Sequence, residues 1–189
     1  MEKKIFRLLP LGLVFIILFY YVIRQSNENN EQLALKDNWI TLFQYKADFE
    51  SVGKVSFISQ DSIKFEGNHA AFIGKDILYG PTFYSDSAQL IRNINKIEVR
   101  CKILSKAVLK DMQFVASVEN ETGGIYWKSI GLGDKIKINE WGDASGYFEV
   151  DPSAFKGNGK LYLKVYLLNS KEEECAVDNF EIAGYQLNQ

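Results

Sequence analysis

A row of tyrosines and a lysine near the C-terminus has the residue types and spacing of a binding surface. Over residues 159–168, Tyr162, Lys164 and Tyr166 alternate with leucine and valine. Alternate side chains of a β-strand point to opposite faces, so this row shares one face and the apolar residues share the other. Sugars present an apolar face and a rim of hydroxyl groups, which suit aromatic rings beside a charged group. The row predicts either a glycan-binding surface or cross-strand packing of tyrosines.

Two further positions extend the predicted binding surface. Arg100 alternates with apolar residues over 95–104, as does Lys102, and we expect both on a neighbouring strand of the same sheet. Tyr126 and Trp127 are consecutive, so they point to opposite faces of a strand and one of them is exposed. The sequence leaves open which one, and Trp127 is taken as the candidate ligand contact.

Catalytic chemistry has little support. His69 is the single histidine, no close pair of cysteines is spaced for a metal, and no nucleophile-elbow or phosphate-binding glycine motif occurs. Acid–base hydrolysis of a glycoside needs two carboxylates across one linkage. Glu149 and Asp151 lack an acidic partner at position 154, which is alanine, and they are interpreted as strand-end and turn residues. We therefore expect a noncatalytic domain that needs no catalytic cofactor.

The elements that would position these residues are short strands. From Trp39 onward, runs rich in valine, isoleucine, phenylalanine and tyrosine alternate with turn residues about every 8–12 positions, which is typical of an all-β domain. Strands with one apolar face imply two sheets packed face to face. Pro81 indicates an edge strand or a bulge. The expected strands are 39–46, 54–58, 61–65, 69–73, 77–84, 95–104, 112–119, 124–132, 146–150, 159–168 and 174–183.

The N-terminal segment has the pattern of a membrane anchor. Residues 8–23 carry no charge, and the apolar stretch 5–23, with Arg7 near the headgroups, is about 19 residues or roughly 28 Å long as a helix, close to a hydrocarbon thickness of roughly 30 Å. A cleaved signal would end in small residues, whereas Tyr20 and its neighbours are large. More basic residues precede the stretch than follow it, so the N-terminus is expected to be cytoplasmic.

This pattern divides the chain into three parts and places most of it outside the cytoplasm. We expect a single transmembrane helix over residues 1–24, a polar tether over 25–37, and a periplasmic or extracellular domain over 38–189. The 24 acidic and 22 basic residues give a net charge of −2, without the basic excess of a nucleic-acid-binding protein. Cys101 and Cys175 are expected to be buried free thiols, with a disulfide between them as the alternative.

The C-terminal strands resemble those of jelly-roll carbohydrate-binding modules, which have a galactose-binding-like fold. The resemblance rests on the long strand 160–169, the closing strand 177–182 with Asp178 and Asn179, Trp141 with the stretch 147–152, and the small residues of 67–71. It covers about residues 39–185 and implies a two-sheet antiparallel jelly-roll β-sandwich. A structural calcium ion, held by oxygens such as those of Asp178 and Glu50, is a further implication of the resemblance.

Two functions follow as hypotheses. The first is a membrane-anchored, noncatalytic module of a bacterial envelope that binds a glycan through Tyr162, Tyr166, Lys164, Arg100 and Trp127. The alternative is an envelope interaction or structural protein that docks another protein.

Overall fold

The computed structural model describes residues 38–50, 58–60, 64–133, 136–171 and 173–188. The expected membrane helix and tether lie outside these residues, as does most of the expected strands at 54–58 and 61–65. Within the described residues, no helix has the length and apolar character needed to cross a membrane.

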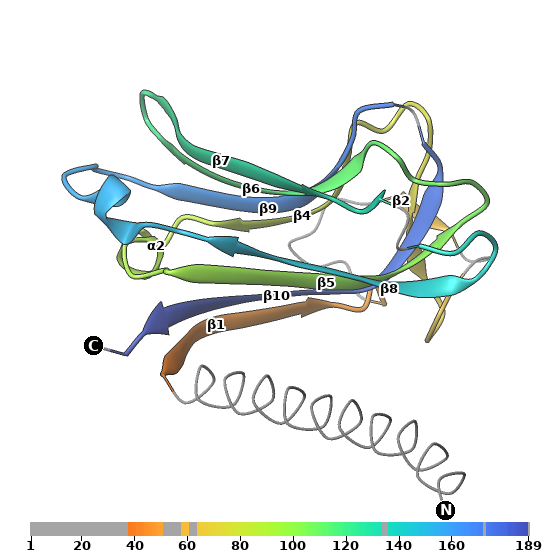
Figure 1. The fold of residues 1–189 in the computed structure, drawn as a ribbon, viewed down its shortest axis with the longest axis horizontal. Coiled ribbons are helices and arrows are strands. Elements are labelled where there is room, and N and C mark those ends of the chain that lie inside the picture. The colour runs from red at the N-terminus through yellow and green to blue at the C-terminus, as the bar shows by residue number, and fades with distance from the viewer. Residues whose placement is uncertain (1–37, 51–57, 61–63, 134–135, 172, 189) are drawn as a thin grey trace, which may run out of the picture. The chain divides into compact units, whose positions relative to one another are not determined.

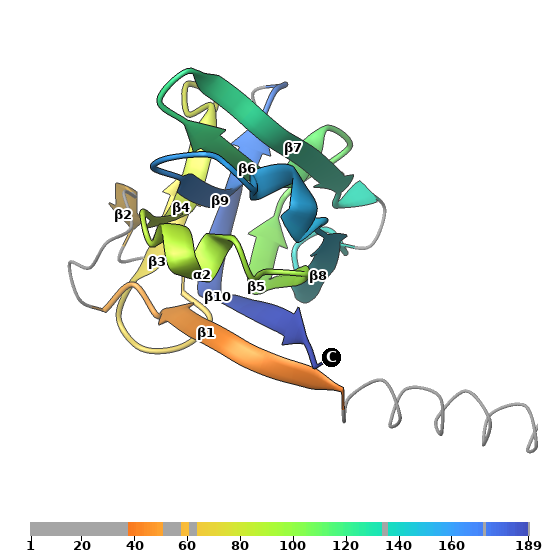
Figure 2. The same ribbon diagram turned by 90° about the vertical axis from the view of Figure 1, so that its left-hand side faces the viewer.

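Two antiparallel sheets form two layers, which Figures 1 and 2 show from two directions. The six-stranded sheet has the order β2 (Ile58–Gln60), β3 (Ala70–Ile73), β10 (Cys175–Leu187), β5 (Lys96–Ser105) and β8 (Trp141–Glu149), with β1 (Trp39–Ala47) also paired to β10. The four-stranded sheet has the order β4 (Tyr79–Ser85), β9 (Tyr162–Asn169), β6 (Met112–Asn120) and β7 (Gly123–Gly131). The expected β-sandwich is confirmed.

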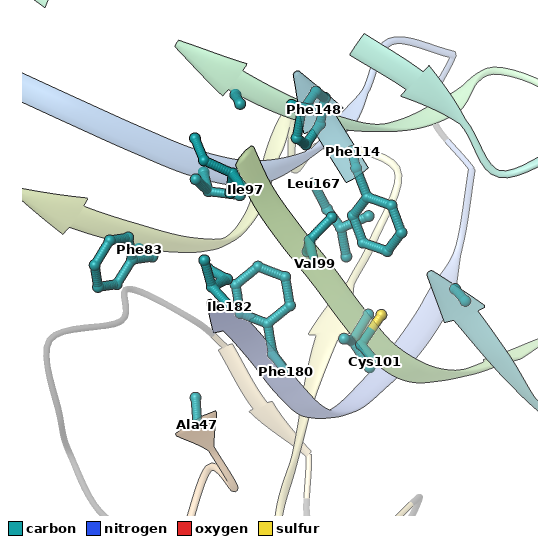
Figure 3. Packing of buried hydrophobic residues seen from close by; sticks show 14 of the residues in the cluster. Ala47, Phe83, Ile97, Val99, Cys101, Phe114, Phe148, Leu167, Phe180 and Ile182 are labelled. Atoms are coloured by element: carbon teal, nitrogen blue, oxygen red, sulfur yellow. The ribbon is translucent and has the colours of Figure 1, made fainter. Parts of the chain in front are cut away.

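The core lies between the sheets because the strands alternate apolar and polar side chains. In β5 and β9 every second residue is buried, and the intervening ones are largely polar and more exposed. Figure 3 shows Val99, Phe114 and Phe180 among the side chains that fill the interior. Removing such large apolar groups from water stabilises the fold by about 25 cal/mol per Å².

Pro81 and two short helices shape the connections around the sheets. Pro81 lies in β4, at the edge of the four-stranded sheet, where the pairing register shifts between Tyr79 and Thr82, so the expected edge position and bulge are both confirmed. The helix α2 (Ala88–Ile91) and the 3₁₀-helix η2 (Pro152–Phe155) were not expected from the sequence.

Strand β8 begins at Trp141 and not at residue 146, so the expected strand 146–150 left out residues 141–145, which the sequence pattern assigned to a connection. An aspartate, a serine and a glycine at 143–146 made this stretch resemble a turn. The small residues serve packing instead: a Cβ added to Gly146 would lie 3.0 Å from the side chain of Ile130. Glycine is therefore the residue that lets the two sheet edges approach here.

Cys101 and Cys175 are buried free thiols, as expected. Cys175 lies opposite Ser105 in the pairing of β10 with β5, four residues along the strand from Cys101, or about 13 Å at the usual rise per residue. A disulfide needs Cα atoms within about 7 Å. Burial raises the pKa of both thiols well above the ordinary value, so they pack as small apolar groups.

Candidate functional site

The outer face of the four-stranded sheet brings together most of the predicted binding residues. One row crosses all four strands, because Tyr84 lies opposite Lys164, Lys164 opposite Ser117, and Ser117 opposite Trp127. Tyr162 and Tyr166 flank Lys164 on the same face of β9, as predicted. We call this surface the aromatic face, defined by Tyr79, Tyr84, Glu119, Trp127, Tyr162, Lys164 and Tyr166.

The tyrosines of the aromatic face form cross-strand pairs between β4 and β9. The rings of Tyr84 and Tyr162 stack with centroids 6.2 Å apart, and those of Tyr79 and Tyr166 meet edge to face at 5.5 Å. Such pairs stabilise a sheet, so the cross-strand packing weighed in the sequence interpretation is present. Tyr79 and Tyr84 nevertheless remain exposed, which leaves ring surface for a ligand.

Trp127 is an exposed ring of the aromatic face without a ring partner among the described residues. Its side chain is 57% exposed, and it makes no ring contact with any residue in the described parts of the chain. The preceding residue, Tyr126, lies on the inner side, with its ring 6.4 Å from that of Phe155 and its hydroxyl donating to the carbonyl of Glu149 at 3.2 Å. The structure thus decides which of the two consecutive aromatic residues is exposed.

An ion pair lies among the rings. Lys164 Nζ is 2.8 Å from Glu119 Oε2, and Ser117, which lies opposite Lys164 on the same strand as Glu119, is buried. Partial desolvation and then the charge of Asp86 raise the pKa of the Tyr84 hydroxyl. Charged donors and acceptors beside aromatic rings can orient the hydroxyl groups of a sugar while the rings cover its apolar face.

Arg100 and Lys102 do not join the aromatic face, so the expectation that they share its sheet was wrong. Both lie on β5 of the six-stranded sheet. Arg100 Nε is 2.7 Å from Glu181 Oε2, and Lys102 Nζ is 2.7 Å from Asp143 Oδ1. Alternation along a strand shows that one face is buried, but it does not show which of two sheets the strand enters.

The residues missed by the sequence interpretation are Tyr79, Tyr84 and Glu119. The segment containing both tyrosines was predicted as a strand, but the register shift between Tyr79 and Thr82 interrupts the alternation that would have assigned their faces. Glu119 stands near the end of β6, and only the pairing with β9 places it beside Lys164. The signal available in the sequence was that two predicted strands, 77–84 and 159–168, both carry tyrosines.

Glu149 and Asp151, which the sequence interpretation assigned to a strand end and a turn, have structural roles. Glu149 ends β8, and Asp151 caps η2 by accepting a hydrogen bond from the amide of Ser153 at 2.9 Å. Hydrogen bonds from Ser153 lower the pKa of Asp151. Both residues therefore have the strand-end and turn positions predicted for them.

Glu50, one of the carboxylates suggested for calcium, holds the backbone of the segment 64–69. It accepts hydrogen bonds from the amides of Asn68 and His69 and from the side chain of Asn68. These bonds, with that from His69 first, lower the pKa of Glu50. Gly67 lies so close to this carboxylate that a Cβ there would overlap it.

Asp178, the other suggested ligand, is buried and holds the same segment. Its Oδ2 accepts from the amides of Phe65 and Glu66 at 3.1 Å each, and its Oδ1 accepts from the amide of Asn179 at 2.7 Å. No cluster of three or more histidine, cysteine or acidic side chains placed to hold a metal occurs in the described residues. Glu50 and Asp178 therefore have structural roles, and calcium binding by them stays a prediction.

Solved structures with the same sandwich are carbohydrate-binding modules. The CBM22-1–CBM22-2 tandem domain of Paenibacillus barcinonensis Xyn10C matches with a TM-score of 0.52 at 12% identity, over 80% of this chain and 47% of the tandem. The CBM22-2 xylan-binding domain of the same Xyn10C matches with a TM-score of 0.50 at 8% identity, over 76% of this chain and 99% of that domain. A CBM35 from Cellvibrio japonicus Abf62 has a TM-score of 0.46 at 10% identity, over 78% of this chain and 99% of that one.

The chain therefore shares the fold of the two CBM22 structures, whose TM-scores are 0.50 or higher. Identities this low establish a shared architecture and leave the ligand to be argued from the site. No protein-family model matches the sequence, and no curated protein matches it.

Proposed function

We propose that the chain is a noncatalytic glycan-binding module that contacts a neutral polysaccharide through the aromatic face. The observation that carries the proposal is the row across the four-stranded sheet, in which exposed Trp127 and the Tyr84 ring flank Lys164 and its partner Glu119. Open rings with charged groups between them match the alternating apolar and hydroxyl surfaces of a sugar chain. The shared fold with carbohydrate-binding modules, one of them xylan-binding, supports this function.

The proposal includes display of the module on the outer side of a bacterial membrane. The support comes from the sequence: an uncharged stretch long enough to span, with more basic residues before it than after it. In this arrangement residues 5–23 cross the membrane, the N-terminus is cytoplasmic, and the sandwich is periplasmic or extracellular. Protease added to intact spheroplasts should digest the sandwich, and protection of the sandwich would contradict this topology.

Binding is tested with the full-length chain in detergent on an array of neutral oligosaccharides that includes xylohexaose. We expect the double variant Tyr162→Ala/Tyr166→Ala to bind at least about tenfold more weakly, because two partly exposed rings, and the support that they give to Tyr84 and Tyr79, are lost from the face. The matched control is Lys46→Ala/Lys102→Ala, which alters two charged residues on the six-stranded sheet. Unchanged binding by the tyrosine variant would remove the aromatic face as the glycan site. If no glycan binds and one envelope protein is crosslinked through position 127, the docking alternative replaces the proposal.

A further inference from the structure

A hollow of about 460 Å³ lies on the six-stranded sheet, away from the aromatic face. Its size falls in the range of small-ligand sites. It extends across the edge strand β8, where Gly146 has no side chain and Ile130 of β7 forms part of the wall. Its lining residues are Glu98, Val99, Arg100, Ile130, Ser145, Gly146 and Tyr147.

The acidic group of this hollow already has partners. Glu98 is 2.6 Å from Lys96 Nζ through Oε1, and its Oε2 accepts a hydrogen bond from the hydroxyl of Tyr185 at 3.1 Å. Lys96 in turn lies over the rings of Tyr147 and Tyr185, at 5.5 and 5.6 Å from their centroids. The negative charge of Glu98 is therefore compensated within the fold and presents little barrier to an anionic ligand.

Arg100 is the residue of this hollow that still has unused hydrogen-bond donors. Its Nε is held by Glu181 at 2.7 Å, and Glu181 is shared with Lys46 at 3.4 Å. The Arg100 side chain is 61% exposed, and its two terminal nitrogens have no hydrogen-bond partner among the residues that the structure describes. A guanidinium fixed at Nε with its other nitrogens open is preorganised to receive a carboxylate.

An aromatic platform and a hydroxyl lie beside this guanidinium. Tyr147 is 59% exposed, and Ser145 is paired with Arg100 across β8 and β5, next to the pair of Tyr147 with Glu98. The two residues thus share the outer face of the sheet with Arg100. Of the two charged residues that line the hollow, Glu98 is paired with Lys96, and Arg100 keeps its terminal nitrogens open.

We propose that this hollow is a second binding site, which takes a uronic acid residue of an acidic glycan. The sugar carboxylate binds the terminal nitrogens of Arg100, the apolar face of the ring covers Tyr147, and the Ser145 hydroxyl bonds a sugar hydroxyl. The site lies on another sheet and is independent of the aromatic face. The chain as a whole is mildly acidic, so recognition rests on local contacts and weakens with added salt.

The test is isothermal titration of the full-length chain in detergent with trigalacturonate, and in parallel with the neutral galactose trisaccharide of the same linkage. We expect trigalacturonate to bind and the neutral trisaccharide to bind at least about tenfold more weakly, since the carboxylate contact is lost. Arg100→Gln should reduce trigalacturonate affinity about tenfold or more. The matched control Lys102→Gln removes the same charge from the same strand, and we expect a change below about threefold.

Two further variants separate a specific site from general charge attraction. Glu181→Gln removes the carboxylate that fixes Nε of Arg100, so trigalacturonate should bind more weakly although a negative charge is lost, whereas Asp143→Asn, with the same change in charge, should not weaken binding. Tyr147→Phe should retain affinity and Tyr147→Ala should lose it. The proposal is overturned if trigalacturonate does not bind, if Arg100→Gln and Lys102→Gln weaken it equally, or if Tyr147→Ala has no effect. Circular dichroism of each variant establishes that it is folded.

Discussion

The two outer faces of the sandwich use their long side chains differently. On the six-stranded sheet, charged residues pair with one another, as in Lys102 with Asp143 and Arg100 with Glu181. At one end the segment containing Phe65 covers this face: Lys102 lies 4.8 Å from the centroid of the Phe65 ring. Most of the polar groups there have partners within the chain.

The aromatic face of the four-stranded sheet leaves more of its side-chain surface without a partner in the chain. Its tyrosines pair across strands but keep exposed rings, and Trp127 stands without a ring partner in the described residues. The comparison teaches that charge alone is a poor guide to a binding surface in this fold, because a β-sheet pairs its own charges readily. Ring surface and donors left without partners are the better guide.

The covered end of the six-stranded sheet depends on Asp178. We expect Asp178→Ala to lower the free energy of unfolding by about 2 kcal/mol, because the part-buried amides of Phe65 and Glu66 lose the charged acceptor that the buried Asp178 supplies. Urea unfolding followed by circular dichroism measures the loss. Asp178→Asn keeps one carbonyl oxygen, so its free energy of unfolding should lie between those of the unchanged chain and Asp178→Ala. A loss below about 1 kcal/mol would mean that the segment is held by other contacts.

Two rings of nearly equal exposure allow the two faces to be compared directly. Trp127 is 57% and Tyr147 is 59% exposed, on opposite sheets. We expect Trp127→Ala to weaken xylohexaose binding at least about tenfold and Tyr147→Ala to weaken trigalacturonate binding by a similar factor. The ratio of xylohexaose affinity to trigalacturonate affinity, measured by titration calorimetry, should therefore fall in Trp127→Ala and rise in Tyr147→Ala. A parallel shift in both variants would show that the faces do not bind separately.

Tyr126, on the inner side of β7, differs from the exposed Trp127 because its burial makes the stability of the fold depend on pH. Burial, followed by the charge of Glu149, raises the pKa of Tyr126 from 10.0 to about 12. The folded state thus holds this proton more tightly than the unfolded state, so the stabilisation is complete below pH 10 and is lost as the pH rises toward 12. Thermal unfolding across this range should show a steeper decline than in Tyr126→Phe. Tyr147→Phe, at an exposed ring, is the control, and equal slopes in the two variants would contradict the role of Tyr126.

The aromatic row of β9 could be predicted because its evidence is local. Tyr162, Lys164 and Tyr166 alternate with buried residues over one strand, and alternation depends only on neighbours in sequence. The assignment of Arg100 failed because the sheet that a strand joins is decided by pairing with distant segments. Asp178 was suggested as a metal ligand from the family resemblance. Its hydrogen bonds from the amides of Phe65 and Glu66 could not be predicted, because these residues are distant in sequence.

The smallest expected effect concerns the ion pairs of the two faces. Lys164 and Glu119 lie 2.8 Å apart with both side chains partly covered, whereas Lys102 pairs at 2.7 Å with the largely exposed Asp143. Double-mutant cycles with alanine should give a coupling below about 1 kcal/mol for either pair, and a larger one for Lys164 with Glu119, because water screens the exposed carboxylate more effectively. The coupling is read from urea unfolding of the single and double variants at low and high salt. A larger coupling for Lys102 with Asp143 would reverse the ranking and show that cover by the neighbouring Phe65 ring outweighs the exposure of the carboxylate.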